Sequence, residues 1–137
     1  MYAPLGWASK GSDVNEEIAR ESIKVNYYGT KYVTDKFLPL MSYPGRIINV
    51  SSTSSAYALN CMNEQHRNKF LDDNLTIQQL ESYLNEFASA VGHNNHQEQG
   101  YPNSCYGMSK VGVSMLTRIY SRDYAKNGLT INCGCPG

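Results

Sequence analysis

Tyr106 and Lys110 stand four residues apart in a segment with helical spacing, which places both side chains on one face of a helix. A positive charge beside a phenol stabilises the phenolate, so such a pair gives up a proton more readily than an isolated tyrosine. The pair is therefore suited to donate a proton to a carbonyl oxygen that receives a hydride. Two other pairs with the same spacing are interpreted as ordinary neighbours on a helix surface. These are Tyr27 with Lys31 and Tyr32 with Lys36.

Polar residues elsewhere in the chain give this pair a context. The β-branched segment Arg46–Ser51 predicts a buried parallel strand, and ligands collect at the carboxyl end of such strands. A serine hydroxyl at this point, from Ser51 or Ser52, is therefore a candidate to position a carbonyl group, although both residues could belong to a merely polar loop. Asn26 is a poor helix former among apolar residues. Its amide is either satisfied in the core or bends the helix and frees a backbone carbonyl.

The first element that must position these residues is a long helix. We expect it over Asp13–Met41, with Ser12 or Asp13 as its cap and with Pro39 and Pro44 near its end. Apolar and aromatic residues recur along it at roughly helical spacing. They are Ile18, Ile23, Val25, Tyr28, Tyr32, Val33, Phe37 and Leu40.

The rest of the chain predicts one more helix and one more strand after a polar segment. Residues 60–100 are rich in Asn and Gln and contain two helical patches, the second of which opens with the capping-box pattern Thr76–Gln79. A helix is expected from after Ser104 to about Asn127, with Gly128 as its C′ residue. Leu129–Cys133 then predicts a second short strand.

Two strands separated by a helix indicate a crossover connection in an α/β sheet. Two parallel strands alone would leave an open edge on each side and an uncovered face. We therefore expect an incomplete doubly wound, Rossmann-like parallel sheet.

Composition narrows the function. Hydrophobic residues make up 41% of the 137 residues and the formal net charge is zero, so no nucleic-acid or anionic-membrane partner is expected. Nothing approaches a membrane-spanning apolar run, and the first eleven residues lack the pattern of a secretory signal. The cysteines form no CxxC pair, which favours reduced thiols in a cytoplasmic protein and inert packing for Cys133 and Cys135. No metal is expected, since the spacing of His93 and His96 is a weak match to a metal site and no cluster of Cys or carboxylate residues supports it.

Four motifs, taken together and in this order, resemble the short-chain dehydrogenase/reductase family. They are Asn26–Thr30, Gly45–Ser52, Ser104–Lys110 and Ile131–Gly137. The 54 positions that separate Ser52 from Tyr106 exceed the usual spacing in this family. A polar, partly helical insert at about residues 57–102 resembles the monomeric, NADPH-dependent carbonyl reductases of animals and related plant ketone reductases.

The resemblance implies a role for each candidate residue. Tyr106 would be the general acid, and Lys110 would assist its ionisation and hold the nicotinamide ribose. Ser52 would position the substrate carbonyl, and Asn26 would help keep a water relay to Lys110.

The resemblance also implies a cofactor site and a reaction. Pro136 and Gly137 would lie beside the nicotinamide ring, while Tyr106 and Lys110 would contact the cofactor as well. The expected reaction is reduction of aldehydes, ketones or quinones by a hydride from NADPH, in a protein that is monomeric as a whole.

One part of the family pattern does not occur in this sequence. The Gly-rich turn TGxxxGxG, which would bind the cofactor pyrophosphate, is absent, and Met1–Pro4 stands where an Asn-Asn-Ala-Gly strand end would fall. We therefore expect residues 1–137 to form a partial Rossmann-like catalytic domain. The alternative is a truncated, non-catalytic paralogue or fragment that acts through protein interactions.

Overall fold

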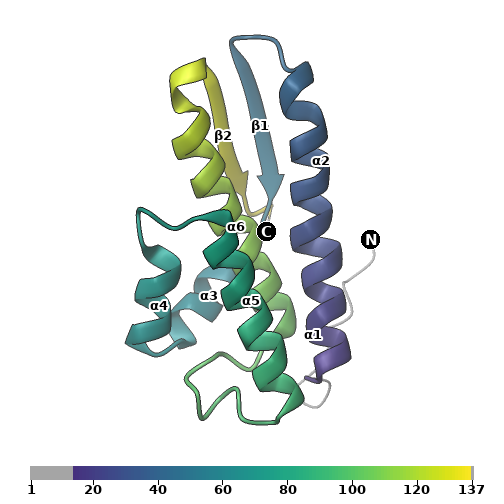
Figure 1. The fold of residues 1–137 in the computed structure, drawn as a ribbon, viewed down its shortest axis with the longest axis vertical. Coiled ribbons are helices and arrows are strands. Elements are labelled where there is room, and N and C mark those ends of the chain that lie inside the picture. The colour runs from purple at the N-terminus through teal and green to yellow at the C-terminus, as the bar shows by residue number, and fades with distance from the viewer. Residues whose placement is uncertain (1–13, 137) are drawn as a thin grey trace.

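A computed structural model describes residues 14–136 of the chain. Its elements, drawn in Figure 1, are α1 (Glu16–Ser22), η1 (Ile23–Tyr28), α2 (Gly29–Phe37), η2 (Leu38–Leu40), β1 (Gly45–Val50), α3 (Thr53–Cys61), α4 (Glu64–Leu71), α5 (Ile77–Gly92), α6 (Cys105–Tyr124), η3 (Ala125–Asn127) and β2 (Leu129–Gly134). Among the described residues, no helix combines the length and the apolar character needed to cross a membrane.

The two strands pair in parallel, as the helix between them predicts. Gly45 lies opposite Leu129 and Val50 opposite Gly134, so the carboxyl ends of both strands meet at one edge of the sheet. The strands lie side by side in Figure 1, with the long helix next to β1. The α/β class with a parallel sheet is confirmed. Each strand bound differs from the expected one by no more than a residue.

One face of the sheet packs on α6 and the other does not. Ile131 is buried, and the buried Asn49 side chain donates a hydrogen bond to Thr117 Oγ1 of α6 at 2.9 Å. The alternate residues of β1 point the other way, so Ile48 is 70% exposed and Val50 is 61% exposed. Within the described residues, this sheet therefore has one covered face and one face open to water, on which Ile48 and Val50 are exposed.

The long helix begins later than the sequence predicts. Its N-cap is Asn15, whose side chain accepts a hydrogen bond from the amide of Ile18 at 2.9 Å, so the helix starts at Glu16 and not at Asp13. The expected caps, Ser12 and Asp13, lie outside the described residues. The helix also contains a π-helical turn, η1, in which the amide of Gly29 bonds to the carbonyl of Lys24 five residues earlier.

The apolar stripe read from the sequence does not mark the buried face of this helix. Of its members only Ile23 is buried, while six are exposed. The six are Val25, Tyr28, Tyr32, Val33, Phe37 and Leu40. The face that packs on α5 and α6 carries Ala19, Ile23 and Tyr27 and then, beyond the π turn, Thr34. A helix that is apolar on both sides gives a periodicity that cannot tell which side is covered.

Three helices occupy the segment between β1 and α6. The capping box is confirmed, since Thr76 Oγ1 accepts from the amide of Gln79 and the Gln79 side chain accepts from the amide of Thr76. Phe87 of α5 is fully buried, and α5 packs on both α1 and α6. Gly112 permits this packing, because a Cβ there would meet Leu84 and Tyr27 at 3.0 Å.

The last helix forms the centre of the molecule. Twelve of its residues are buried, and it contacts both strands, α3, α5 and the π turn. Gly128 follows it with φ of 74°, in the left-handed region expected of a C′ glycine. Tyr106 and Lys110 therefore lie on a helix that is well packed against the rest of the molecule.

Candidate active site

The candidate site lies where β1 ends and α6 begins. Ser52 caps α3 directly after β1, and Ser104 caps α6 by accepting a hydrogen bond from the amide of Gly107 at 2.9 Å. The carboxyl edge of the parallel sheet therefore faces the first turns of α6. This is the edge at which open α/β sheets bind their ligands.

Tyr106 and Lys110 are brought together as their spacing predicts. Lys110 Nζ lies 5.7 Å from the centroid of the Tyr106 ring, and both side chains are half-buried. The same Nζ donates a hydrogen bond to the carbonyl of Val50 at 3.0 Å, which ties α6 to the last residue of β1. Burial lowers the pKa of Lys110, and nearby Cys135 opposes that change. The ammonium group is thus held at the sheet edge and partly removed from water.

Ser51 and Ser52 are used differently. Ser51 is buried, its Oγ is 2.7 Å from Ser114 Oγ, and it donates to the carbonyl of Lys110 at 3.4 Å. Ser52 is half-buried, and its Oγ accepts from the amide of Ser54 at 3.2 Å, its one hydrogen bond to the residues that the structure describes. The Ser52 hydroxyl therefore keeps its proton available for a ligand, whereas the Ser51 hydroxyl ties β1 to α6.

Asn26 lies in the π turn and is linked to the site through one residue. Its Nδ2 donates to Ser109 Oγ at 2.9 Å, and Ser109 Oγ donates to the carbonyl of Tyr106 at 2.8 Å. Ser109 is fully buried. The Asn26 amide thus has a hydrogen-bond partner, as the first interpretation predicts. The helix is also distorted at this residue, as the second interpretation predicts in part. π turns of this kind recur at functional sites.

The predicted residues do not all meet. Tyr106 and Lys110 are in contact, Asn26 reaches Tyr106 through Ser109, and Ser52 lies at the same edge without a hydrogen bond to any of them among residues 14–136. Pro136 is exposed beyond the end of β2. Gly137 lies outside the described residues.

Sequence reasoning missed three hydroxyl groups that hold the site together. Ser114 Oγ is 2.7 Å from Ser51 Oγ and 2.9 Å from Ser55 Oγ, so it joins the end of β1 and the first turn of α3 to α6. Ser114 and Ser55 are two of the three, and the third is Ser109, whose Oγ joins Asn26 to the backbone of Tyr106. Their positions three and eight residues after Tyr106 could have placed both Ser109 and Ser114 on α6, but their partners come from distant segments.

The other candidate groups have structural partners or lie apart. His93 Nδ1 is 2.8 Å from the carbonyl of Ser89, and His96 Nε2 is 2.9 Å from Asn103 Oδ1. Within residues 14–136, no cluster of three or more metal-ligating side chains is found. Cys133 and Cys135 are both exposed, so the prediction that they are packed in the interior is wrong. They lie at a strand end, where the chain leaves the sheet and its cover.

Comparison with known proteins confirms the family resemblance: the chain is homologous to reductases of the short-chain dehydrogenase/reductase family. It is 34% identical over 123 residues to carbonyl reductase [NADPH] 1 of Macaca fascicularis, which covers 87% of this chain and 44% of that protein. Two solved structures are similar in fold. Menthone neomenthol reductase of Mentha piperita has a TM-score of 0.79 with 37% identity, over 89% of this chain and 43% of the other. Salutaridine reductase of Papaver somniferum has a TM-score of 0.78 with 31% identity, over 90% and 42%.

The chain spans less than half the length of these relatives, whereas each match covers nearly all of this chain. No family model matches the sequence.

Proposed function

We propose that this chain carries the proton-donating part of a reductase that converts aldehydes, ketones or quinones to alcohols with NADPH. The observation that carries the proposal is the contact of Tyr106 with Lys110, held against the carbonyl of Val50 at the ligand-binding edge of the sheet. The names of the relatives support the reaction and the cofactor, since the curated ones are carbonyl reductases [NADPH].

The residues at this edge fit a nicotinamide cofactor. An ammonium group has three hydrogen-bond donors, and Lys110 uses one on Val50, so within the described residues two remain for ribose hydroxyl groups. Pro136 follows β2 at the same edge and is exposed, as contact with a ring would require. NADPH, when bound, supplies the hydride.

The side chains of this chain then handle the proton. The Tyr106 hydroxyl donates its proton to the carbonyl oxygen as negative charge develops there, because the Lys110 ammonium stabilises the phenolate that is left. The Ser52 hydroxyl donates a hydrogen bond to the same oxygen and orients the substrate. Asn26 acts at one remove, through Ser109 and the backbone of Tyr106.

Three broader features belong to the same proposal. The two strands form part of a larger doubly wound sheet, since one face and the edges of the described sheet carry no cover. Residues 57–102 form an insert whose helix α5 covers α1 and α6, which supports a monomer. The protein acts in the cytoplasm, on a small-molecule carbonyl, without nucleic acid or membrane.

Since no Gly-rich turn for the pyrophosphate occurs in this sequence, this chain alone should bind NADPH weakly.

The test is Tyr106→Phe in the protein that contains this chain, with NADPH consumption followed on a quinone and an aldehyde. We expect the rate to fall by about 10²–10⁴-fold, the usual contribution of a positioned acid. Tyr32→Phe is the matched control, because Lys36 Nζ lies 5.6 Å from the Tyr32 ring in nearly the same geometry, on a different helix. An undiminished rate in Tyr106→Phe, or an equal loss in Tyr32→Phe, would contradict the assignment.

A second candidate function rests on the exposed apolar face of the chain. Ile48, Val50 and Phe37 are each more than half exposed, which is typical of a surface that contacts another protein. The chain would then act as a non-catalytic interaction module. Light scattering of the purified chain distinguishes the two, since this alternative requires a defined dimer or complex and a well-folded monomer excludes it.

A further inference from the structure

Cys133 and Cys135 are two free, exposed thiols at the carboxyl end of β2. Residues two apart on a strand point to the same face. Cys133 lines a groove together with Met115 and Thr117 of α6, so its side chain lies on the α6 side of the sheet. Cys135 is the residue after the end of the strand, and we infer from the same alternation that its side chain follows on that side.

Cys135 also adjoins Lys110. Gly134 pairs with Val50, whose carbonyl accepts the hydrogen bond from Lys110 Nζ at 3.0 Å. The amide of Ser51 donates to the carbonyl of Gly134 at 2.9 Å, which fixes the point where the chain leaves the sheet. The influence of Cys135 on the pKa of Lys110 agrees with this placement. The thiol pair therefore has a positive charge at one end.

The residue between the two thiols leaves room for them to approach. An extended strand sets residues two apart at about 6.6 Å between Cα atoms, near the upper limit for a disulfide. A small change at the intervening residue brings them within range, and glycine adopts such conformations at low cost. A Cβ on Gly134 would meet only Ile48 Cγ2, at 4.0 Å, so the surroundings do not restrict this turn.

We propose that Cys133 and Cys135 form a reversible disulfide by exchange with a small disulfide such as oxidised glutathione. The thiolate of one cysteine attacks a glutathione sulfur and releases one reduced glutathione, which leaves a mixed disulfide on the protein. The second thiolate attacks the protein sulfur of that bond, forms the Cys133–Cys135 disulfide and releases the second reduced glutathione. The two protons lost by the protein thiols end on the two released glutathione thiols, the protein is oxidised by two electrons and glutathione disulfide is reduced by two.

The two remaining cysteines serve as internal controls. Cys61 is also exposed, at the end of α3, but it has no second cysteine nearby in the chain. Cys105 is buried, and burial raises the pKa of its thiol to about 11, so very little thiolate is present at neutral pH. Exposure therefore predicts that Cys61 forms a mixed disulfide and that Cys105 does not react. The presence of a second exposed cysteine two residues away predicts a closed ring only at Cys133–Cys135.

The experiment uses oxidised glutathione as the probe and a mass spectrum as the readout. The purified protein is incubated with it, quenched with an alkylating reagent and digested with trypsin without reductant. Cleavage after Lys126 releases both cysteines on the peptide that begins at Asn127, while Cys61 and Cys105 lie on separate peptides. We expect this peptide to escape alkylation and to weigh two hydrogens less than the unmodified dithiol peptide, and to be recovered with both cysteines alkylated after treatment with excess reduced glutathione.

Single variants make the result decisive. Cys135→Ser should stop the reaction at a glutathione adduct on Cys133, whereas Cys61→Ser should leave ring formation unchanged. The proposal is overturned if the peptide that begins at Asn127 stays reduced, or carries glutathione in the wild-type protein without closing the ring. Because this readout is a mass, it is independent of whether the protein reduces carbonyl groups.

Discussion

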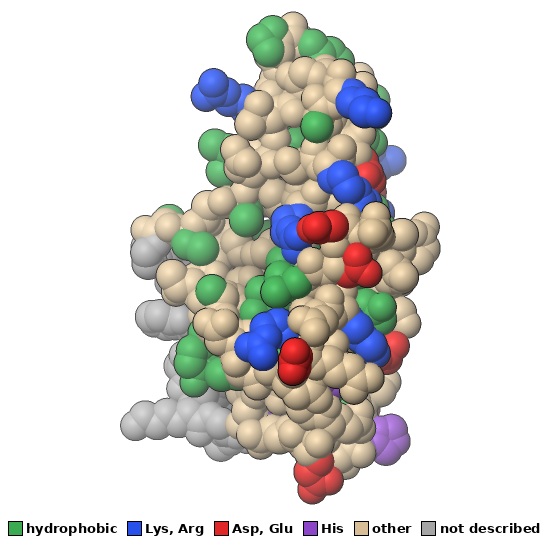
Figure 2. Space-filling model, turned by 90° about the vertical axis from the view of Figure 1, so that its left-hand side faces the viewer, with side chains coloured by type: hydrophobic (Ala, Val, Ile, Leu, Met, Phe, Trp, Pro, Cys, Tyr) green, Lys and Arg blue, Asp and Glu red, His purple; other side chains and the backbone are tan. Residues whose placement is uncertain are grey.

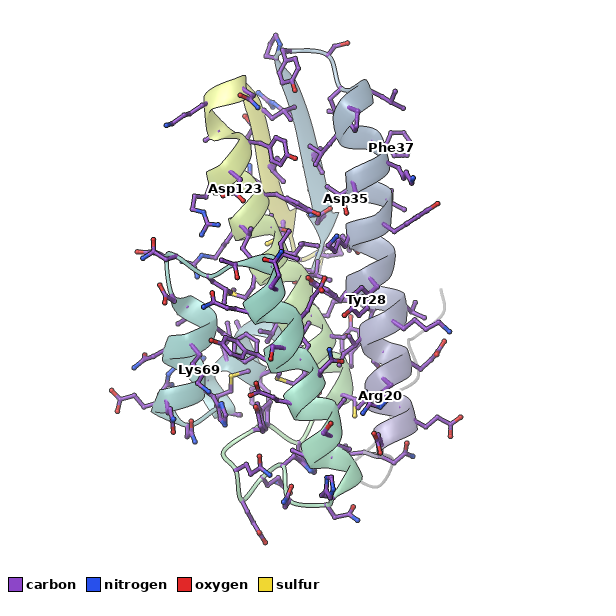
Figure 3. All side chains as sticks on the ribbon, viewed as in Figure 1. Arg20, Tyr28, Asp35, Phe37, Lys69 and Asp123 are labelled. Carbon is purple, nitrogen blue, oxygen red and sulfur yellow. The ribbon has the colours of Figure 1, made fainter. Side chains whose placement is uncertain are left out.

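The α5 side of this molecule and its β1 side contain similar apolar residues but expose them to very different extents. Phe87 of α5 is fully buried, whereas Phe37 of α2 is 58% exposed. Ile131 faces α6 and is buried, whereas Ile48 on the adjacent strand points the other way and is exposed. Figure 3 shows Phe37 on the outer side of α2 and Asp35 on the side toward β1 and α6. Residue type thus marks a candidate for burial, and the element lying opposite decides it.

A third region of the surface carries charged side chains that join neighbouring elements. Figure 2 shows Lys and Arg side chains next to Asp and Glu over the middle of one face, with hydrophobic side chains between them. Arg118 and Arg122 of α6 bind the 71–75 segment, through the carbonyls of Leu71 and Leu75 and through Asp73. The 71–75 segment is therefore held on α6 by polar contacts at the surface as well as by packing in the core.

The largest difference between the two flanks should appear on truncation of their phenylalanines. Phe87→Ala removes a fully buried ring and should cost about 3–5 kcal/mol of unfolding free energy. Phe37→Ala is the matched control on the exposed flank and should stay within about 0.5 kcal/mol of wild type. Urea denaturation measures both. Equal losses would mean that a partner covers Phe37 in solution.

A smaller effect is expected where α2 faces α6. Tyr120 and Lys31 both donate hydrogen bonds to Asp35. Burial raises the pKa of Asp35, but these two hydrogen bonds outweigh it and hold the pKa below its usual range. A carboxylate with a lowered folded-state pKa adds stability above its unfolded pKa, and that stability is lost as the pH falls through the folded value.

Asp35→Asn should therefore lower the unfolding free energy by about 1–2 kcal/mol at neutral pH, allowing for partial exposure. The difference should shrink when the pH drops below about 3.9, the ordinary value for aspartate. Denaturation at several pH values measures it. Asp123→Asn, whose partner Arg122 is its chain neighbour, is the control and should change the unfolding free energy at neutral pH by no more than about 0.5 kcal/mol. A difference that grows in acid would mean that the folded-state pKa of Asp35 is raised and not lowered.

The link between the π turn and α6 should contribute less again. Asn26→Ala removes the donor to the buried Ser109 hydroxyl and should cost about 1 kcal/mol. Asn85→Ala, on an exposed position of α5, serves as the control. Denaturant unfolding measures both. If the two variants lose the same amount, the bridge from Asn26 to Ser109 contributes nothing measurable.

The smallest effect is expected on the open face of the sheet. In the isolated chain, replacing Ile48 and Val50 together with Thr keeps the β-branched shape and should leave the unfolding free energy within about 0.5 kcal/mol. Self-association, measured by light scattering, should fall because the exposed apolar area is reduced. A marked loss of stability instead would show that this face is covered in solution.

Sequence patterns were most informative where the deciding contacts are local. The capping box at Thr76, the left-handed Gly128 and the two strands follow from neighbouring residues and agree with the structure. The Tyr106–Lys110 contact also follows from helical spacing alone.

Contacts between distant segments could not be read in the same way. The bridge from Asn26 to Ser109 joins residues 83 positions apart, and the exposure of Phe37 depends on what lies opposite α2. The residues alone do not distinguish Ser51 from Ser52, and the physical difference between them lies in the hydrogen bonds that Ser51 makes to α6. Roles taken from the family resemblance stay predictions until Tyr106 and its partners are replaced.

The π turn at Ile23–Tyr28 has a consequence for how this gene can vary in length. A π turn closes its hydrogen bond over one residue more than an α turn, so η1 holds one residue that regular winding would not need. A single-codon deletion there should convert it to an α turn and leave the flanking helices in phase. The same deletion in α2 would rotate everything beyond it by about 100° and turn Leu38 out of the core. The turn is thus the one place in η1 and α2 where the helix can lose a residue and keep both ends packed.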